Sequence, residues 1–189
     1  MKQLLSDISR CALCRHELPL GPRPVVQAST HSRILIIGQA PGSKVHATGV
    51  PWNDPSGDQL REWLGVDKAC FYDPNWFAFM PMGFCYPGKG RSGDLPPMKR
   101  CAPTWHETLR SAMPDIQLTL LVGQYAQKHY LKDRLSLTER VKNRQDYLPE
   151  YMPLPHPSPR NRLWQRRNPW FSDHVVPQLL DQVQSILQA

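Results

Sequence analysis

The chain has 189 residues, a size typical of one domain with its own core, so we expect a single domain over 1–189. Its formal net charge is +7, from 23 lysines and arginines against 16 acidic residues, which favours an anionic partner. A signal-peptide pattern and a run of about 20 apolar residues are both absent from the sequence, which argues against a secreted or membrane-spanning protein. We therefore expect a cytoplasmic protein without membrane association.

Hydrophobic patterning predicts strands and helices that alternate along the chain. Short apolar runs predict strands at 33–37, 76–80, 117–123 and 151–154. Helical spacing and capping residues predict helices at 2–11, 56–64, 102–112, 124–132 and 171–187. The segment 86–100, rich in glycine, proline and basic residues, is predicted to be an irregular loop. This alternation predicts the fold class α/β, a three-layer α/β/α sandwich with a mainly parallel four-stranded central sheet.

A long polar loop, Gly38–Gly57, follows the first predicted strand and carries Lys44, His46, Trp52 and Asp54. Most connections between a strand and a helix have about 2–6 residues, so this length is unusual. Ligands of open α/β sheets bind outside the carboxyl ends of strands, which is where this loop begins. We therefore predict a functional site here; the alternative is an ordinary connection.

Five cysteines in a chain without secretion signals indicate metal or redox chemistry more than disulfides. Cys11 and Cys14 form a CxxC pair, and Cys85 and Cys101 follow much later. Four thiolates are the number that a tetrahedral zinc ion or a cubane iron–sulfur cluster needs, and their spacing alone does not choose the metal. The alternative is that the later cysteines are small core residues, as we expect for Cys70.

A second loop, 156–171, follows the last predicted strand and contains four arginines, two tryptophans and a phenylalanine. Arginines neutralise phosphates, and aromatic faces stack on bases. His156 stands at the strand end between prolines and can donate a hydrogen bond to a carbonyl oxygen. The alternative is a solvated basic turn whose tryptophans only pack against the protein.

Together these stretches resemble the uracil-DNA glycosylase superfamily. Gly-Gln-Ala-Pro-Gly at 38–42, with Thr-Gly-Val-Pro-Trp at 48–52 and Ser-Gly at 56–57, is similar to the first motif of its iron–sulfur, family-four branch. His-Pro-Ser-Pro-Arg-Asn at 156–161 resembles the second motif of the single-strand-selective branch. The cysteine pattern Cx2C–x70–Cx15C fits the spacing of the family-four cluster, and 101–105 resembles the helix start after the last ligand.

The resemblance implies a DNA glycosylase that hydrolyses the N-glycosidic bond of uracil or another deaminated base during base-excision repair. It also implies a [4Fe–4S] cluster on Cys11, Cys14, Cys85 and Cys101, with zinc or an empty site as the fallback. The implied partner is DNA with the damaged base flipped out of the helix, and we expect a monomer.

The matched motifs imply roles for single residues. His156 matches the histidine that donates to the base O2, and the backbone of Gln39 and Ala40 matches the other donors. Trp52 matches the aromatic residue, usually phenylalanine, that stacks on the flipped base. The implied substrate-binding residues are Gly38, Ala40, Pro41, Gly42, Trp52 and Pro81. The implied DNA-binding residues are Ser158, Arg160, Asn161, Arg162, Leu163, Arg166 and Arg167, with Arg160 or Leu163 as the wedge in the duplex.

Three positions depart from the family pattern. Gln39 stands where family-four members carry an acidic residue, and Ala40 where another branch carries aspartate. Pro81 stands where the family has the asparagine that reads the uracil edge. The candidates for placing the water that attacks C1′ are therefore His46, Asp54 and Gln39.

Two other functions compete with this interpretation. A non-catalytic relative would bind nucleic acid and hold a base without cleaving it, as the missing asparagine and carboxylate favour. The retained His156 and Trp52 favour the enzyme. A glycosidase acting on free nucleosides is disfavoured by the basic, aromatic stretch 160–171, because a nucleoside needs no phosphate clamp.

Overall fold

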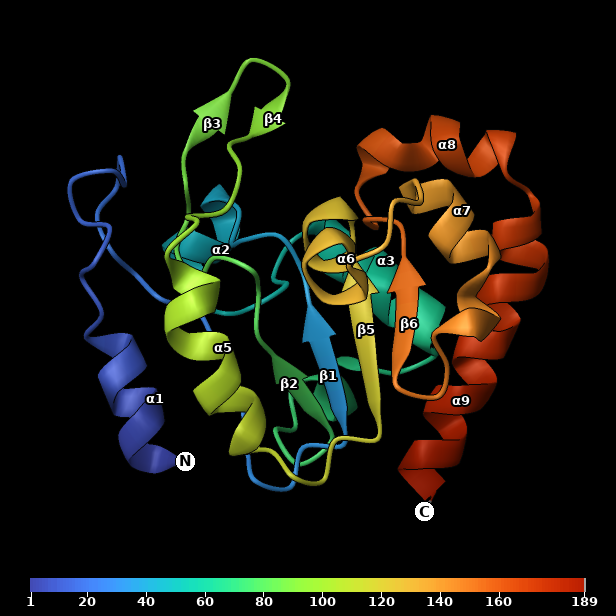
Figure 1. The fold of residues 1–189 in the computed structure, drawn as a ribbon, viewed down its shortest axis with the longest axis horizontal. Coiled ribbons are helices and arrows are strands. Elements are labelled where there is room, and N and C mark those ends of the chain that lie inside the picture. The colour runs from blue at the N-terminus through green and yellow to red at the C-terminus, as the bar shows by residue number, and fades with distance from the viewer. Residues whose placement is uncertain (189) are drawn as a thin grey trace.

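The computed structural model describes residues 1–188 and is built on a central sheet of four parallel strands (Figure 1). These strands are β1 (Ile34–Ile37), β2 (Phe77–Phe79), β5 (Leu118–Val122) and β6 (Tyr151–Leu154). Their order across the sheet is β2-β1-β5-β6, and every neighbouring pair is parallel. The four predicted strands and the parallel sheet are confirmed.

The strands form because their apolar runs are buried on both faces. Alternate side chains of β1 enter different cores: Ile34 and Ile36 face one layer of helices, and Leu35 and Ile37 face the other. All four residues are fully buried, as expected for a central parallel strand.

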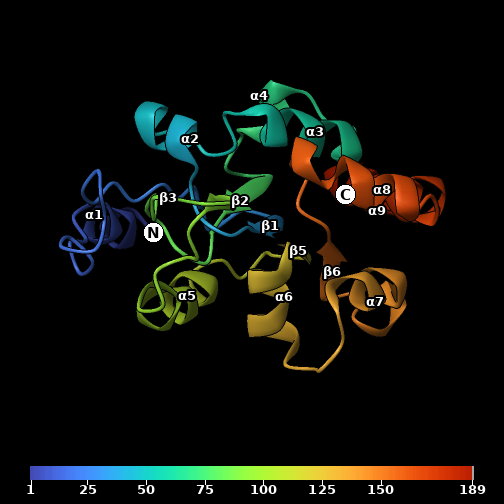
Figure 2. The ribbon, with the colours of Figure 1, turned by 90° about the horizontal axis from the view of Figure 1, so that it is seen from above.

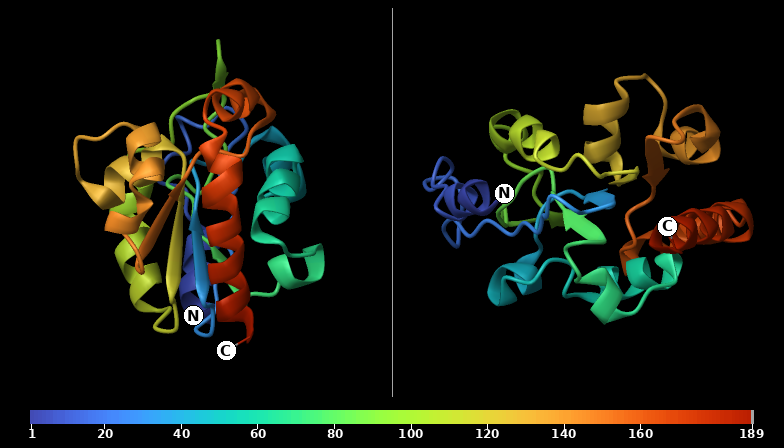
Figure 3. Two further views of the ribbon diagram at one scale, coloured as in Figure 1. Left: turned by 90° about the vertical axis from the view of Figure 1, so that its right-hand side faces the viewer. Right: turned by 90° about the horizontal axis from the view of Figure 1, so that it is seen from below.

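Helices cover both faces of the sheet, which confirms the three-layer α/β/α sandwich (Figures 2 and 3). The core on one face includes α3 (Pro55–Leu64), α4 (Lys68–Phe71) and α9 (Val176–Gln188), which is preceded by a π-helical turn, Phe171–Val175. The core on the other face includes α1 (Lys2–Ser9), α5 (Cys101–Ser111) and α6 (Gln124–Leu131). The short α7 (Leu137–Lys142) packs at the β6 edge, followed by a 3-10 turn, Arg144–Asp146.

Short elements in three segments differ from the sequence prediction. The loop after β1 contains α2 (Ser43–Thr48), and the basic loop after β6 contains a 3-10 turn, Pro159–Asn161, and α8 (Arg162–Arg167). The segment predicted to be irregular forms an antiparallel hairpin of β3 (Lys89–Gly90) and β4 (Gly93–Asp94). Helices of six residues and strands of two depend on their surroundings, so periodicity gives little signal for them.

The strand order places a crevice at the carboxyl ends of the strands. The chain leaves β1 for β2 on one side and returns to β5 on the other, so the connections diverge above β1. The loop with α2, the hairpin and the loop with α8 all leave from this edge (Figure 1). Among residues 1–188, no helix has the length and apolar character needed to cross a membrane.

Candidate active site

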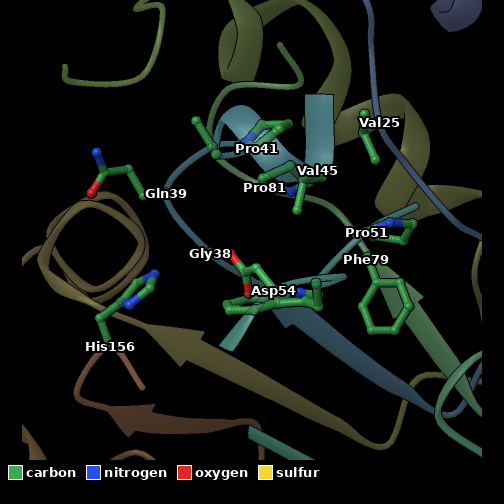
Figure 4. Close-up of a pocket in the computed structure, with 13 residues that line it drawn as sticks. Val25, Gly38, Gln39, Pro41, Val45, Pro51, Asp54, Phe79, Pro81 and His156 are labelled. Atoms are coloured by element: carbon green, nitrogen blue, oxygen red, sulfur yellow. The ribbon is translucent and has the colours of Figure 1, made fainter. Parts of the chain in front are cut away.

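A pocket of about 470 Å³, its open mouth included, lies at the carboxyl ends of β1, β2 and β6 (Figure 4). Figure 4 shows Gln39 and His156 on one side of it and Phe79, Pro51 and Val25 on the other. Nine predicted site residues line the pocket: Gly38, Gln39, Ala40, Pro41, Gly42, Trp52, Asp54, Pro81 and His156. Four lining residues were not predicted: Val25, Val45, Pro51 and Phe79.

Trp52 is held in place by its backbone and by two glycines. Its φ of 56° lies in the left-handed region, which a bulky residue adopts only under strain. The indole packs on Gly38, where an added Cβ would lie 3.0 Å from the ring. The Gly57 backbone approaches so closely that a Cβ there would overlap the Trp52 carbonyl oxygen. The ring centroids of Trp52 and His156 are 5.8 Å apart, so both rings face the same pocket.

Asp54 joins the pocket to the start of α3. Its Oδ1 accepts a hydrogen bond of 2.9 Å from the backbone N–H of Gly57, which caps the helix, and Pro55 supplies the first helical residue. Its Oδ2 lies 3.9 Å from the position of a Cβ on Gly42, at the pocket wall. One carboxylate oxygen therefore caps the helix, and the other lies near the pocket wall.

His156 follows β6 and is fixed through its own backbone. The Asn161 side chain donates a 2.7 Å hydrogen bond to the His156 carbonyl oxygen, which ties the turn together. Burial lowers the pKa of His156, and the nearby Asp54 carboxylate opposes this effect in part. The imidazole is therefore neutral near pH 7, with one nitrogen as a donor and the other as an acceptor.

The first motif is fixed to the segment that follows β2. The N–H groups of Met82 and Gly83 donate to the carbonyl oxygens of Gly38 and Gln39 at 2.9 and 3.0 Å. The side chain of Gln39 donates through Nε2 to the carbonyl oxygen of Leu95 at 3.0 Å. The Gln39 amide thus bonds to the foot of the β3–β4 hairpin as well as lining the pocket.

His106, which sequence reasoning missed, supports the pocket from behind. It is 3% exposed on α5, and its Nε2 lies 3.0 Å from the carbonyl oxygen of Pro81. Because a carbonyl only accepts, Nε2 carries the proton, and Nδ1 accepts from the Tyr130 hydroxyl at 2.6 Å. Burial lowers the pKa of His106 to about 4. A lone histidine on a helix gives no sequence signal for such a role, because its partners are distant along the chain.

His46, predicted as a candidate for placing water, does not line the pocket. It lies on α2, where its ring centroid is 6.0 Å from that of Tyr86, and its backbone carbonyl accepts from Arg23 at 2.7 Å. Of the three candidates for placing water, Asp54 and Gln39 are the two that face the pocket.

The predicted DNA-binding residues lie on the turn and helix after His156. Ser158 caps the 3-10 turn by accepting from the Arg160 N–H at 3.3 Å, and Arg160 itself donates through Nη1 to the Ser92 carbonyl oxygen at 3.0 Å. On α8, the exposed side chains are Arg162, Leu163, Arg166 and Arg167. Leu163 is 57% exposed, whereas Arg160 is bonded to the hairpin. Leu163 is therefore the freer of the two candidate wedges.

The aromatic residues of the second loop pack inward. The indole N–H of Trp164 donates to the Thr138 hydroxyl at 2.9 Å, and its ring lies 5.8 Å from Trp170 and 5.6 Å from Phe171. Phe171 is part of the core under α9 and the two partly buried indoles pack against it, which favours the alternative that these tryptophans pack against the protein. Packing outweighs the polar surroundings because large aromatic surfaces gain most by leaving water.

The four predicted metal ligands, Cys11, Cys14, Cys85 and Cys101, line one cavity, separate from the base pocket. Its other walls are mainly apolar, and the Phe84 N–H donates to the Cys101 sulfur at 3.3 Å. Burial raises the pKa of the Cys85 thiol to about 11 and that of Cys101 to about 12. Within residues 1–188, no set of three or more His, Cys, Asp or Glu side chains is arranged tightly enough to hold a metal ion. Cys70 lies elsewhere and packs against the α3–α9 core.

Comparison with known families agrees with this arrangement. The family model described as the Uracil DNA glycosylase superfamily matches residues 25–180, which include every residue that lines the pocket. The match covers most of the chain and supports a glycosylase-like function that acts on DNA. The chain therefore belongs to the uracil DNA glycosylase superfamily.

Proposed function

We propose that the protein is a monomeric DNA glycosylase that hydrolyses the N-glycosidic bond of uracil or another deaminated base. Within the superfamily, we place it closest to the iron–sulfur, family-four branch, with a second motif like that of the single-strand-selective branch. The observation that carries the proposal is the pairing of Trp52 and His156, from two loops more than a hundred residues apart, across one pocket.

The chemistry assigns a role to each side of the pocket. The bond between the base nitrogen and C1′ breaks, the base takes the electron pair, and a water oxygen bonds to C1′. Trp52 offers a stacking face to the flipped base. The neutral His156 donates its N–H to the carbonyl oxygen on which negative charge gathers, and the backbone of Gln39 offers a second donor. The proton released by the water finally neutralises the departing base.

Asp54 is the best-placed group for holding the attacking water. Its Oδ1 already accepts from Gly57, so Oδ2 is the oxygen left to bind water beside Gly42. Gln39 is less suited, because its side chain is anchored to Leu95 through Nε2 and a neutral amide cannot take up the proton of the water. In this proposal His46 has no part in the reaction.

The alternative is a relative that binds a base without cleaving it. Two observations favour it: Pro81 occupies the wall where the family's asparagine would read the base, and the Gln39 side chain is already engaged. Proline has no side-chain donor, and its carbonyl oxygen here already accepts from His106. Recognition of a base in this pocket therefore depends on fewer polar contacts.

Incubation with oligonucleotides bearing uracil, hypoxanthine or xanthine separates the two functions. We expect release of one of these bases, measured as strand cleavage at the abasic site after alkali, from single-stranded or duplex substrates. Tight binding to these oligonucleotides without any base release would instead support the non-catalytic relative. The undamaged oligonucleotide of the same sequence is the control.

Charge reversal of Arg166 and Arg167 tests the basic surface on α8. Both side chains are exposed, so the variant Arg166→Glu with Arg167→Glu should fold normally. We expect weaker binding to all DNA sequences and a salt dependence with a smaller slope, because each phosphate contact contributes about 0.9 to that slope. Fluorescence anisotropy at several salt concentrations measures both. Unchanged affinity and slope would show that these arginines face solvent and do not contact DNA.

We further propose that Cys11, Cys14, Cys85 and Cys101 hold a [4Fe–4S] cluster in a structural role. Four soft sulfur donors around one apolar cavity fit such a group, because cubane clusters take four cysteine thiolates. The raised pKa values of Cys85 and Cys101 are those of the metal-free thiols, and ligation requires their deprotonation. The side chains must also close in around the cluster to bind it.

Protein purified without oxygen should contain about four iron and four sulfide per chain. Replacing Cys85 or Cys101 by serine should lower both, because each removes one ligand. Cys70→Ser is the matched control and should keep the full content, since Cys70 packs in another core. Iron content that is equally low in all variants and in the parent, with stoichiometric zinc in the parent, would contradict the cluster and identify zinc.

A further inference from the structure

The β3–β4 hairpin projects from the same edge of the sheet on which the pocket opens (Figures 1 and 3). Its two strands have two residues each, and none of its side chains belongs to either hydrophobic core. A two-stranded ribbon of this kind adds little to the stability of a domain. A contribution to stability therefore does not explain why the hairpin lies beside the pocket.

Two hydrogen bonds tie the hairpin to the two loops that build the pocket. At its foot, the Leu95 carbonyl oxygen accepts from Gln39 of the first motif at 3.0 Å. At its tip, the Ser92 carbonyl oxygen accepts from Arg160 of the second motif at 3.0 Å. Gly93, with φ of 145°, lets the guanidinium come close, because a Cβ there would lie 2.5 Å from Arg160 Nη1. The hairpin is thereby positioned relative to the pocket.

The hairpin carries two basic residues and one acidic residue, all at exposed positions. Lys89 and Arg91 are both exposed to solvent. Asp94, the one acidic residue of the segment 86–100, has a carboxylate oxygen 3.5 Å from the position of a Cβ on Gly42 in the pocket wall. Partial burial raises the pKa of Asp94, and Asp54 adds to this effect, whereas the positive charges of Arg160 and Lys89 oppose it. Asp94 is itself exposed and stands opposite Lys89 in the hairpin, so the two basic residues outnumber the acidic one and leave the hairpin with a net positive charge for a partner.

We propose that the hairpin is the second wall of a nucleic-acid groove, with Lys89 and Arg91 contacting phosphates across the pocket from α8. Figure 1 places the hairpin and α8 at one edge, with the ends of β1 and β5 between them. A nucleotide held in the pocket has phosphates on both its sides, so a groove needs cations on both walls. This inference rests on the proposed function, because it takes the bound chain to be DNA.

The test removes the two charges without reversing them. The hairpin variant combines Lys89→Gln and Arg91→Gln. The control variant combines Lys2→Gln and Lys68→Gln and so loses the same charge elsewhere. Lys2 is exposed on α1 and Lys68 on α4, which precedes β2. Anisotropy with a labelled, undamaged oligonucleotide measures affinity across a series of salt concentrations. We expect the hairpin variant to bind roughly ten- to a hundredfold more weakly, with a salt slope smaller by about 2, and the control to match the parent.

Thermal unfolding of both variants should match the parent, since neither pair is buried. Equal affinity and slope for the hairpin variant and the parent, in a parent that binds DNA and releases a base, would overturn this inference alone. Loss of affinity to the same extent in the control would also overturn it, because the effect would then follow net charge. A parent that neither binds DNA nor releases a base would overturn the inference together with the proposed function.

Discussion

If the protein excises bases as proposed, we expect His156→Ala to lower the excision rate by about 10²–10³ and to leave the fold intact. Removing one hydrogen-bond donor from developing negative charge typically costs this much in rate. His156 is the titratable side chain of the second motif that lines the pocket, and its lowered pKa keeps it as a neutral donor. The measurement is a single-turnover excision rate on a saturating oligonucleotide, with circular dichroism to verify folding.

His46→Ala is the matched control for this result. His46 belongs to the loop of the first motif but lies outside the pocket lining, against Tyr86. We expect its rate to stay within a few-fold of the parent. A full rate for His156→Ala, or a larger loss for His46→Ala than for His156→Ala, would show that the donor has been assigned to the wrong histidine.

We expect the free energy of unfolding to fall by roughly 3 kcal/mol as the pH drops from about 6.5 to about 4, because of His106. Burial lowers the pKa of His106 to about 4, and the charges of His129 and Arg110 add to this effect; the hydrogen bond to Pro81 opposes it. In this window the unfolded chain binds a proton at this site and the folded chain does not. Stability due to this group is therefore complete above pH 6.5 and is lost on acidification.

Chemical denaturation at a series of pH values measures this slope. His106→Gln should remove most of it and cost stability at pH 7, since it disturbs the contacts to Tyr130 and Pro81. A smaller slope should remain, because burial also lowers the pKa of His156 and His129. His31→Gln is the control, since His31 is exposed beside Asp115. A pH dependence that is the same in His106→Gln and the parent would refute the assignment.

The sheet was predictable because its strands are continuous apolar runs. Ile34–Ile37 and Leu118–Val122 leave no alternative to a buried position, and the helices between strands favour parallel pairing. The gathering of Gly38, Trp52 and His156 followed from the same fact, since loops at the carboxyl ends of neighbouring strands meet.

What escaped prediction depends on contacts between distant residues. The hairpin rests on bonds to Gln39 and Arg160, and its short Gly-Arg-Ser-Gly turn was the one local signal for it. The indole of Trp164 finds a partner in Thr138, which periodicity cannot reveal. The position of His46 outside the pocket depended on α2, a helix too short to show in the sequence.

The backbone conformation of Trp52 lowers the stability of the fold, while its ring lines the pocket proposed to bind a base. A left-handed conformation at a bulky residue costs about 1–3 kcal/mol, against a total stability of about 5–15 kcal/mol for a typical domain. Glycine at this position would adopt the same angles without strain but would present no aromatic ring. Selection for thermostability alone would thus favour losing the ring, and selection for base binding would favour keeping the strain. In the proposed function, the strain that lowers stability and the ring that stacks on a base therefore belong to the same residue.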